Sequence, residues 1–309
     1  MDISNNSSSV ALSCWKKFYW RYDQKLTPIR QSAALTLGSA VHEAFDQFYK
    51  GKSKQDTLLY IKRAFDSEIE QLAPEEQENM TIMKYTALGM FGHFPYFNTV
   101  FEEQESEKEF RIKLCYGVYF TGRVDGLVKK DGVWWLRELK TTGQTLRQFH
   151  QRISLSSQAM AYIWAMRKLG YDVKGVMFDY IKKPLLRKKV CEDQYEFGTR
   201  ILGDYKTRPD QYFGQIFSYH NDRTINEWEE DAISIAKDIQ GKKRSKRYYR
   251  NTNNCYSYNS ECPYKKICFD GKPDNLMLQL YYRRDGKEIH QEGGDNNDRN
   301  KKEGIKQGV

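Results

Sequence analysis

The placement of four cysteines most constrains the fold of this 309-residue chain. Cys14 lies near one end, whereas Cys255, Cys262 and Cys268 lie close together near the other. The spacing of these three is that of a metal-binding or cluster-binding loop, and four thiolates suit either an iron–sulfur cluster or tetrahedral zinc. If Cys14 supplies the fourth ligand, segments about 240 residues apart in the sequence must meet in the fold.

The stretch between these cysteines changes its hydrophobic period, which predicts an α/β fold. Apolar residues predict helices over 11–27, 35–48, 55–72 and 75–101. From about 107 to 142 the pattern alternates as in strands, with a hairpin turn at Asp131-Gly132. Further helices are expected over 156–169, 194–207 and 226–240, and further strands over 173–182 and within 209–220.

These elements predict a single domain over residues 11–270. The polar residues 1–10 predict a flexible N-terminus, and 271–309 form a C-terminal extension that is expected to be disordered from about 291. The sequence contains neither a signal-like segment nor a long apolar run, so we expect a cytoplasmic, intracellular protein with no membrane partner. In a reducing compartment, metal ligation or burial explains six cysteines better than disulfides do.

The charge balance favours a polyanionic partner. Fifty Lys and Arg against 41 Asp and Glu give a net charge of +9, and 22 Tyr, 16 Phe and 6 Trp are interleaved with the basic residues. Aromatic faces beside cations suit single-stranded or frayed nucleic acid. Three basic stretches stand out, at 16–21, 182–189 and 242–250. The third is the best candidate for DNA binding because Tyr248 and Tyr249 add stacking surfaces, and the alternative is a solvated loop or a localisation tag.

A carboxylate and a lysine in the predicted strands suggest metal-dependent chemistry. Glu138 and Lys140 are two apart and therefore share one face of a strand, and the hairpin register places Asp125 opposite Glu138. Two adjacent carboxylates repel unless a cation lies between them, and Mg²⁺ or Mn²⁺ would suit such oxygen ligands. Lys140 could then orient a water, with His42 completing the ligand set. The alternative for Glu138 and Lys140 alone is a solvated salt bridge.

These residues resemble a known nuclease family. The motifs are Gly122-x-x-Asp125, Glu138-x-Lys140 and Gln158-x-x-x-Tyr162, preceded by His42 in a helix. Together they resemble the RecB-like branch of the PD-(D/E)XK nuclease superfamily. The resemblance covers roughly residues 10–270, and it implies a mixed central β-sheet flanked by helices, with a helical N-terminal part and a C-terminal cluster loop.

The resemblance also implies roles for the site residues. It implies that the metal is bound by His42, Asp125, Glu138 and Leu139, the last through its carbonyl oxygen. Lys140 would be catalytic. Gln158 and Tyr162, one helical turn apart, would line the site and either contact the scissile strand or orient Lys140. The alternative for these two is an ordinary amphipathic helix.

The cysteines resemble a subset of that family. Cys262-Pro263-Tyr264 followed by Cys268 is similar to the iron–sulfur nucleases of the AddB-type and of the CRISPR-associated adaptation type, and to bacteriophage nucleases. In them, one cysteine before the core and three after it bind a [4Fe–4S] cluster. The chain departs from the commoner pattern because six residues, instead of two, separate Cys255 from Cys262. Zinc stays open as the alternative occupant.

The sequence therefore predicts a metal-dependent DNase. We expect an exonuclease that acts on DNA ends or single strands in replication, recombination or repair, with a helicase or recombination protein as a possible partner. The alternative is a non-cleaving or partner-dependent DNA-binding module with a structural iron–sulfur or zinc site. The intact set of Asp125, Glu138 and Lys140 favours cleavage.

Overall fold

A computed structural model describes residues 1–29, 33–257, 260–269 and 281–283. The chain divides into two compact units. We call Met1–Ser9 with Gln31–Ser245 the α/β unit, and Val10–Arg30 with Lys246–Val309 the cysteine unit. The stretch for which the sequence predicts disorder, from about 291, lies outside the described residues. No described helix has the length and apolar character needed to cross a membrane.

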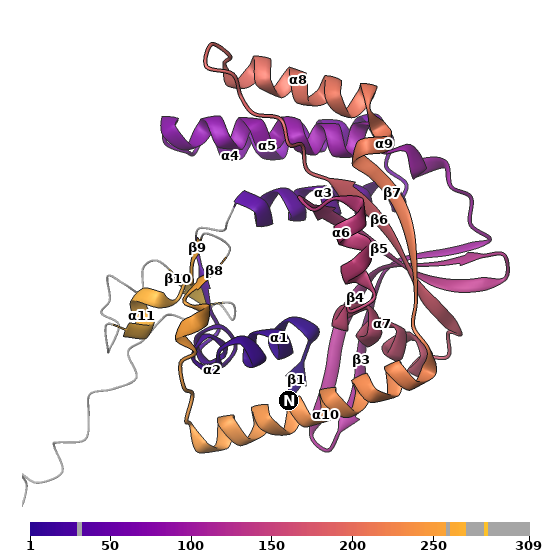
Figure 1. Ribbon diagram of the computed structural model, residues 1–309, viewed down its shortest axis with the longest axis vertical. Helices are drawn as coiled ribbons and strands as arrows, with labels where there is room; N and C mark the ends of the chain where they lie inside the picture. Colours follow the sequence, from indigo (N-terminus) through magenta and orange to yellow (C-terminus); the bar gives the residue numbers. More distant parts are fainter. Residues whose placement is uncertain (30–32, 258–259, 270–280, 284–309) are drawn as a thin grey trace, which may run out of the picture. The chain divides into compact units, whose positions relative to one another are not determined.

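The α/β unit contains a six-stranded mixed sheet and the helices around it (Figure 1). Its strands are β1 (Asp2–Ile3), β3 (Glu103–Cys115), β4 (Val118–Lys130), β5 (Val133–Thr142), β6 (Val173–Lys182) and β7 (Phe213–Tyr219). Its helices are α3 (Ala33–Tyr49), α4 (Lys54–Ile69), α5 (Pro74–Gly92), α6 (Leu146–Ile153), α7 (Ser157–Lys168), α8 (Gln194–Thr207), α9 (Pro209–Tyr212) and α10 (Asp222–Ser245), with a 3₁₀ turn, η2 (Pro95–Asn98). The predicted mixed sheet flanked by helices is confirmed.

The N-terminal residues are ordered into secondary structure, although the sequence predicts a flexible segment there. Strand β1 pairs in parallel with β4, with Asp2 opposite Tyr119 and Ile3 opposite Phe120. Helix α1 (Asn5–Ser13) follows it. The reason is an open edge on β4: its backbone groups find partners in β1, and Ile3 is buried as a result.

The turn at Asp131-Gly132 sets the register of the central hairpin. Both residues have positive φ, 53° and 72°, as a tight hairpin turn requires. Strand β4 pairs with β3 along one edge, and its C-terminal half pairs with β5 in antiparallel fashion. Strands β5 and β6 are parallel, and β7 completes the sheet as an antiparallel neighbour of β6. The sheet is therefore mixed.

Strands β4 and β5 separate at the point that matters for the site. Their ladder ends at the pair of Gly126 and Arg137, whereas β5 continues to pair with β6 as far as Thr142. Asp125 and Glu138 are the next residues beyond the end of that ladder. The divergence leaves backbone groups on the β4-facing edge of β5 available to side chains.

Each face of the sheet is covered by helices. Helices α3, α4, α5 and α8 gather on one side (Figure 1), where Leu139 and Ile181 from the sheet join their apolar core. Side chains on the other face of the sheet pack against α7 and α10. There the Phe120 ring of β4 lies 6.0 Å from the Trp164 ring and 5.3 Å from the Trp228 ring. The alternation of a strand thus places β5 between two packed layers.

The contact between α5 and α8 allows a test of the packing. A Cβ at Gly89 would lie 2.4 Å from Cδ2 of the buried Tyr205 ring, so Gly89→Ala should lower the free energy of unfolding by about 1–3 kcal/mol. Gly203 is an exposed position of α8, and a Cβ there would meet no atom within 4 Å. Gly203→Ala should therefore raise the free energy of unfolding by up to about 1 kcal/mol. Urea unfolding measures both variants, and equal shifts would contradict this packing.

The cysteine unit joins segments from both ends of the sequence. Its elements are α2 (Trp15–Phe18), a π-helix η1 (Tyr19–Asp23), β2 (Leu26–Pro28), η3 (Thr252–Asn254), β8 (Tyr256–Ser257), β9 (Ser260–Glu261), α11 (Lys265–Phe269) and β10 (Tyr281–Arg283). Strand β10 pairs with β2, and β8 pairs with β9. Its core is formed by Trp20, Leu26, Tyr264, Ile267 and Tyr281. The chain thus folds back on itself within this unit.

Candidate active site

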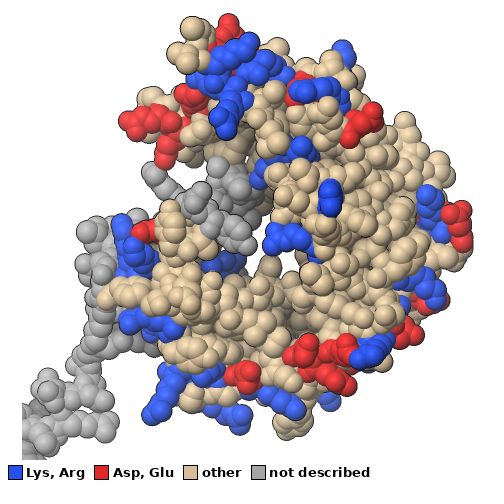
Figure 2. Space-filling model, in the orientation of Figure 1, with Lys and Arg blue, Asp and Glu red and all other residues tan. Residues whose placement is uncertain are grey.

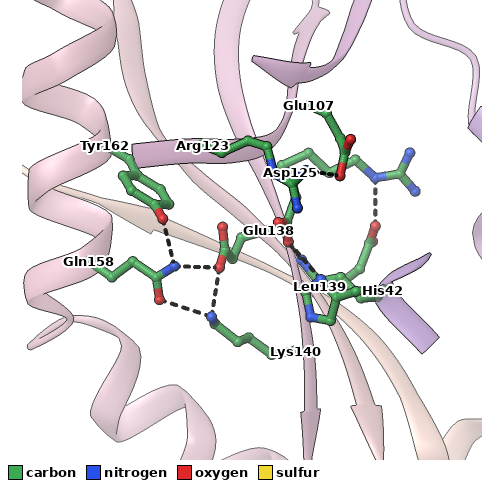
Figure 3. Close-up of polar contacts among 11 residues, drawn as sticks. His42, Glu107, Arg123, Asp125, Glu138, Leu139, Lys140, Gln158 and Tyr162 are labelled. Atoms are coloured by element: carbon green, nitrogen blue, oxygen red, sulfur yellow. Dashed lines mark hydrogen bonds and ion pairs between the residues drawn. The ribbon is translucent and has the colours of Figure 1, made fainter. Parts of the chain in front are cut away.

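A carboxylate and an imidazole meet where β4 and β5 separate. The Asp125 Oδ2 atom accepts a 3.1 Å hydrogen bond from the Leu139 N–H, which the divergence of the strands makes available. The same oxygen lies 3.3 Å from Nδ1 of His42, which α3 delivers to the sheet (Figure 3). Three residues that are far apart in sequence, and that the sequence predicts to share a site, are therefore in contact.

On the neighbouring side of β5, four side chains form a hydrogen-bonded chain (Figure 3). The Lys140 Nζ atom donates to Oε1 of Glu138 at 2.6 Å and to Oε1 of Gln158 at 3.0 Å. The Gln158 Nε2 atom donates to the same Glu138 oxygen at 3.0 Å and lies 3.2 Å from the Tyr162 hydroxyl. Gln158 thus holds both the lysine and the carboxylate, which fixes their relative positions.

Helix α7 begins in the right place to supply Gln158 and Tyr162. The Ser156 hydroxyl caps the helix by accepting a hydrogen bond from the Ala159 N–H. Gln158 lies in the first turn, and Tyr162, four residues on, lies on the same face. The Tyr162 ring packs edge-on against Phe110 of β3, with centroids 5.8 Å apart. The helix therefore places a polar pair over the sheet and anchors it by aromatic packing.

Burial governs the protonation of these groups. It raises the pKa of Glu138, an effect that the Lys140 charge opposes and the Asp125 charge reinforces. Burial likewise raises the pKa of Asp125, against the hydrogen bond from Leu139. It lowers the pKa of His42, which favours a neutral imidazole able to act as a metal ligand. The pKa of Tyr162 rises to about 12, mainly through burial, so its hydroxyl stays protonated at neutral pH.

These properties fit a hard divalent cation. The carboxylates of Asp125 and Glu138 are partly or wholly removed from water, and each is more stable when ionised beside positive charge. Among the described residues, no group of three or more His, Cys, Asp or Glu side chains is placed to hold a metal ion. The full ligand sets, at the sheet and at the cysteines, therefore stay predictions.

A cavity of about 540 Å³ opens beside Asp125 and His42. Strands β3, β4 and β5 and helix α3 form its walls, and Arg137 and Asp179 contribute a buried ion pair of 2.6 Å. The cavity is also lined by Glu107 and Arg123, which form an ion pair of 3.1 Å. The hydrophobic pattern gave no sign of Glu107. Arg123, in contrast, lies within the motif between Gly122 and Asp125, so its position was a usable signal.

The four predicted cluster ligands all lie in the cysteine unit. The Cys14 Sγ atom is 3.4 Å from the Asn251 N–H, and the Cys268 Sγ atom is 3.3 Å from Nε of Arg250. The N–H of Cys262 donates to the Cys255 carbonyl at 2.8 Å. Burial raises the pKa of Cys262, and charges on two other cysteines of the set add to this effect.

Donors directed at sulfur fit a bound group that needs thiolates. A thiolate that binds metal is stabilised by N–H groups, such as those that approach Cys14 and Cys268. The same arrangement serves a [4Fe–4S] cluster and a zinc ion, because both take four thiolates. The pKa of Cys255, the cysteine with the least regular spacing, is raised by burial and by the charges of Cys268 and Cys14.

The structure shows contacts of two of the predicted basic stretches. Lys188, in the second stretch, forms a 2.6 Å ion pair with Glu78. The third is split, with Lys242 to Ser245 in the last turn of α10 and the remainder in the cysteine unit. Acidic and basic side chains lie side by side along α10 (Figure 2). Within the cysteine unit, the Tyr248 hydroxyl bonds to Asp23, and the Tyr248 ring, one of the two predicted stacking surfaces, lies 5.0 Å from the Tyr19 ring.

Replacing Gln158 should test whether it positions the catalytic groups. We expect Gln158→Leu to lower kcat about 10- to 100-fold, because Lys140 and Glu138 both lose a partner that fixes them. A control is Gln148→Leu, since Gln148 caps the neighbouring helix α6 and touches neither group. Steady-state cleavage of an oligonucleotide measures both. Equal rates for Gln158→Leu and Gln148→Leu would show that the hydrogen bonds of Gln158 do not matter for turnover.

Comparison with known proteins agrees with this geometry. No curated protein matches the chain. Residues 2–269, most of the sequence, match the family model of the PD-(D/E)XK nuclease superfamily. Members of this superfamily are phosphodiester hydrolases that act on DNA and use divalent metals such as Mg²⁺ or Mn²⁺. The match spans the sheet, α3 and α7, and with them every candidate residue described above. The chain therefore belongs to the PD-(D/E)XK nuclease superfamily.

Proposed function

We propose that this protein is a Mg²⁺- or Mn²⁺-dependent DNase, an exonuclease that acts on DNA ends or single strands. The observation that carries the proposal is the joint position of Asp125, Glu138 and Lys140. One carboxylate lies on each of two diverging strands, and the lysine ammonium lies 2.6 Å from the second carboxylate. A solvated salt bridge would not explain this arrangement, because the Glu138 side chain is only 6% exposed.

The cation would be held by oxygen and nitrogen ligands from three elements. Those ligands are His42 of α3, Asp125 of β4, and Glu138 with the Leu139 carbonyl of β5. The divergence of β4 and β5 supports the last of them, since it frees the adjoining backbone. When bound, the cation supplies positive charge to the scissile phosphate and lowers the pKa of the attacking water.

We assign the other side chains of the site to steps of the hydrolysis. Lys140, fixed by Glu138 and Gln158, would orient the water and stabilise the negative charge that grows on the phosphate oxygens. The water oxygen bonds to phosphorus while one P–O ester bond breaks, and the proton lost by the water is balanced by protonation of the leaving oxygen. The Tyr162 hydroxyl, protonated at neutral pH, would complete the wall beside the scissile strand.

We also propose that the cysteine unit holds a [4Fe–4S] cluster, with zinc as the alternative occupant. The grouping of Cys14, Cys255, Cys262 and Cys268 in one unit supports this assignment, as do the N–H donors aimed at two of the sulfurs. The role would be structural, because both segments that supply the ligands share one small core. On this basis the protein fits the RecB-like branch that carries such a cluster.

The finer role is DNA processing in replication, recombination or repair in the cytoplasm, with a helicase or recombination protein as a partner. The net charge of +9 supports a polyanionic substrate. No base-reading element is proposed, so we expect little sequence preference.

A comparison of linear and closed circular DNA tests the preference for ends. We expect end-labelled linear single strands to be degraded with Mg²⁺ or Mn²⁺, and closed circular duplex to stay intact. Nicking or linearisation of the circle would identify an endonuclease instead. If protein that was purified without oxygen, with its cluster in place, binds these substrates and cuts none of them, the DNA-binding alternative replaces the nuclease.

A further inference from the structure

Arg123 faces the same cavity as Asp125 without a role in the chemistry described above. The two residues are two apart on β4 and so share a face of the strand. The Arg123 side chain is 56% exposed and lines the cavity. Burial lowers the pKa of His42, and the Arg123 charge lowers it further. Burial raises the pKa of Asp125, and the Arg123 charge acts in the opposite direction. An exposed guanidinium thus lies beside the candidate metal ligands.

The partner of Arg123 has an unusual backbone. Glu107 lies opposite Asp125 in the β3–β4 register but is not part of the ladder, which resumes on either side of it. Its φ is +48°, in the left-handed region that non-glycine residues seldom adopt. Such strain persists where surrounding contacts maintain it, and here it turns the carboxylate toward Arg123 (Figure 3). The position of Glu107 is therefore set by the side chain's partners.

Glu107 holds two cations at once. One is Arg123 at 3.1 Å, and the other is Lys50, the residue after α3, at 2.9 Å. If Arg123 turned away, Lys50 would still lie beside the Glu107 carboxylate, sharing its charge with Asp46, which it contacts at 2.6 Å. An exposed pair of this kind contributes little stability, whereas an arginine can form two parallel charged hydrogen bonds to a phosphate. Exchange of Glu107 for a phosphate is therefore favourable for Arg123.

Other cations near the cavity are less free to make this exchange. The Arg137 side chain is 7% exposed and is bonded to Asp179 at 2.6 Å within the sheet. Lys140 is held by Glu138 and Gln158. Arg123, in contrast, is exposed, forms a weakly stabilising ion pair with Glu107, and lines the same cavity as Asp125.

We propose that Arg123 binds a phosphate of the DNA backbone next to the scissile one, and that Glu107 holds this arginine in place until DNA arrives. The inference rests on the proposed function, because the ligand is the substrate of that reaction. It adds a phosphodiester-binding subsite, Arg123 with Lys50 beside it, and a positioning residue, Glu107.

Binding of a labelled single-stranded oligonucleotide in Ca²⁺, measured by fluorescence anisotropy across salt concentrations, tests the subsite. We expect Arg123→Ala to weaken binding about 10-fold and to reduce the slope of log affinity against log salt by about 1. Arg123→Lys should restore the slope and part of the affinity. Glu107→Gln should bind about 2- to 5-fold tighter, because it removes the competing charge.

Arg111→Ala is the matched control. Arg111 lies on β3, is 53% exposed and pairs with Asp2 at 2.9 Å, so its loss changes the net charge equally. The inference is overturned if Arg123→Ala and Arg111→Ala bind with the same affinity and slope while wild type binds and cuts DNA. It is also overturned if Glu107→Gln abolishes metal-dependent cleavage, since Glu107 would then be a metal ligand. Failure of wild type itself to bind DNA would instead refute the proposed function.

Discussion

Lys140→Ala should lower kcat for DNA cleavage about 10²- to 10³-fold while leaving DNA binding nearly unchanged. Lys140 carries the positive charge that lies 2.6 Å from Glu138, and Gln158 fixes it there. Its removal takes away stabilisation of the charge that develops on the phosphate in the transition state, whereas the ground-state contacts of the DNA backbone stay. The loss should therefore fall on kcat and not on KM.

Lys129→Ala serves as the control for this variant. Lys129 is on the same hairpin, its side chain is 29% exposed against 32% for Lys140, and it also forms an ion pair, with Glu103 at 2.7 Å. Both variants remove one ion-paired lysine charge of similar exposure, but only Lys140 faces the candidate site. Equal and near-normal rates for the two variants would remove Lys140 from the chemistry.

Cys268→Ser should destabilise the cysteine unit by about 4 kcal/mol, by analogy with a cross-link that closes a loop of more than about 100 residues. Cys268 is buried, and its sulfur receives the Arg250 guanidinium at 3.3 Å. Without this ligand the bound metal should be lost, and the segments from the two ends of the chain would no longer be tied together. We expect a clear drop in Tm together with loss of iron, or of zinc, on elemental analysis.

The exposed Cys191 gives the matching control, because Cys191→Ser also removes one thiol and lies outside the cysteine unit. The visible colour of the purified protein separates an iron–sulfur cluster from zinc. An unchanged Tm and full metal content in Cys268→Ser would refute the cluster.

Much of the core was predictable because local signals agreed with the final packing. The hairpin at Asp131-Gly132 fixes the register, and the ladder indeed pairs Gly126 with Arg137 as that turn requires. The predicted helix at 194–207 has those bounds in α8, since Asp193 and Glu196 form a capping box at its start. The approach of Asp125 to His42 followed from motif order and is present at 3.3 Å.

Other features depend on contacts that a single segment does not encode. Helix α6 lies where no helix was predicted, because its eight residues offer only Phe149 and Ile153 as buried positions. Strand β1 forms only because β4 leaves an edge open to it. The left-handed Glu107 has two cationic partners from distant parts of the chain, Lys50 directly after α3 and Arg123 on β4. Tertiary pairing, and not local propensity, decides β1 and Glu107, whereas the capping box of Thr145 and Gln148 is a local signal for α6.

The most direct test of the account is hydrolysis of a linear, end-labelled single-stranded DNA by the wild-type protein, with Mg²⁺ or Mn²⁺ and again with EDTA. The site of Asp125, Glu138 and Lys140 predicts degradation with either metal and none with EDTA. Degradation that persists undiminished in EDTA, or that is equal for Asp125→Asn and wild type, would contradict the claim that this site cleaves DNA with the help of a divalent cation.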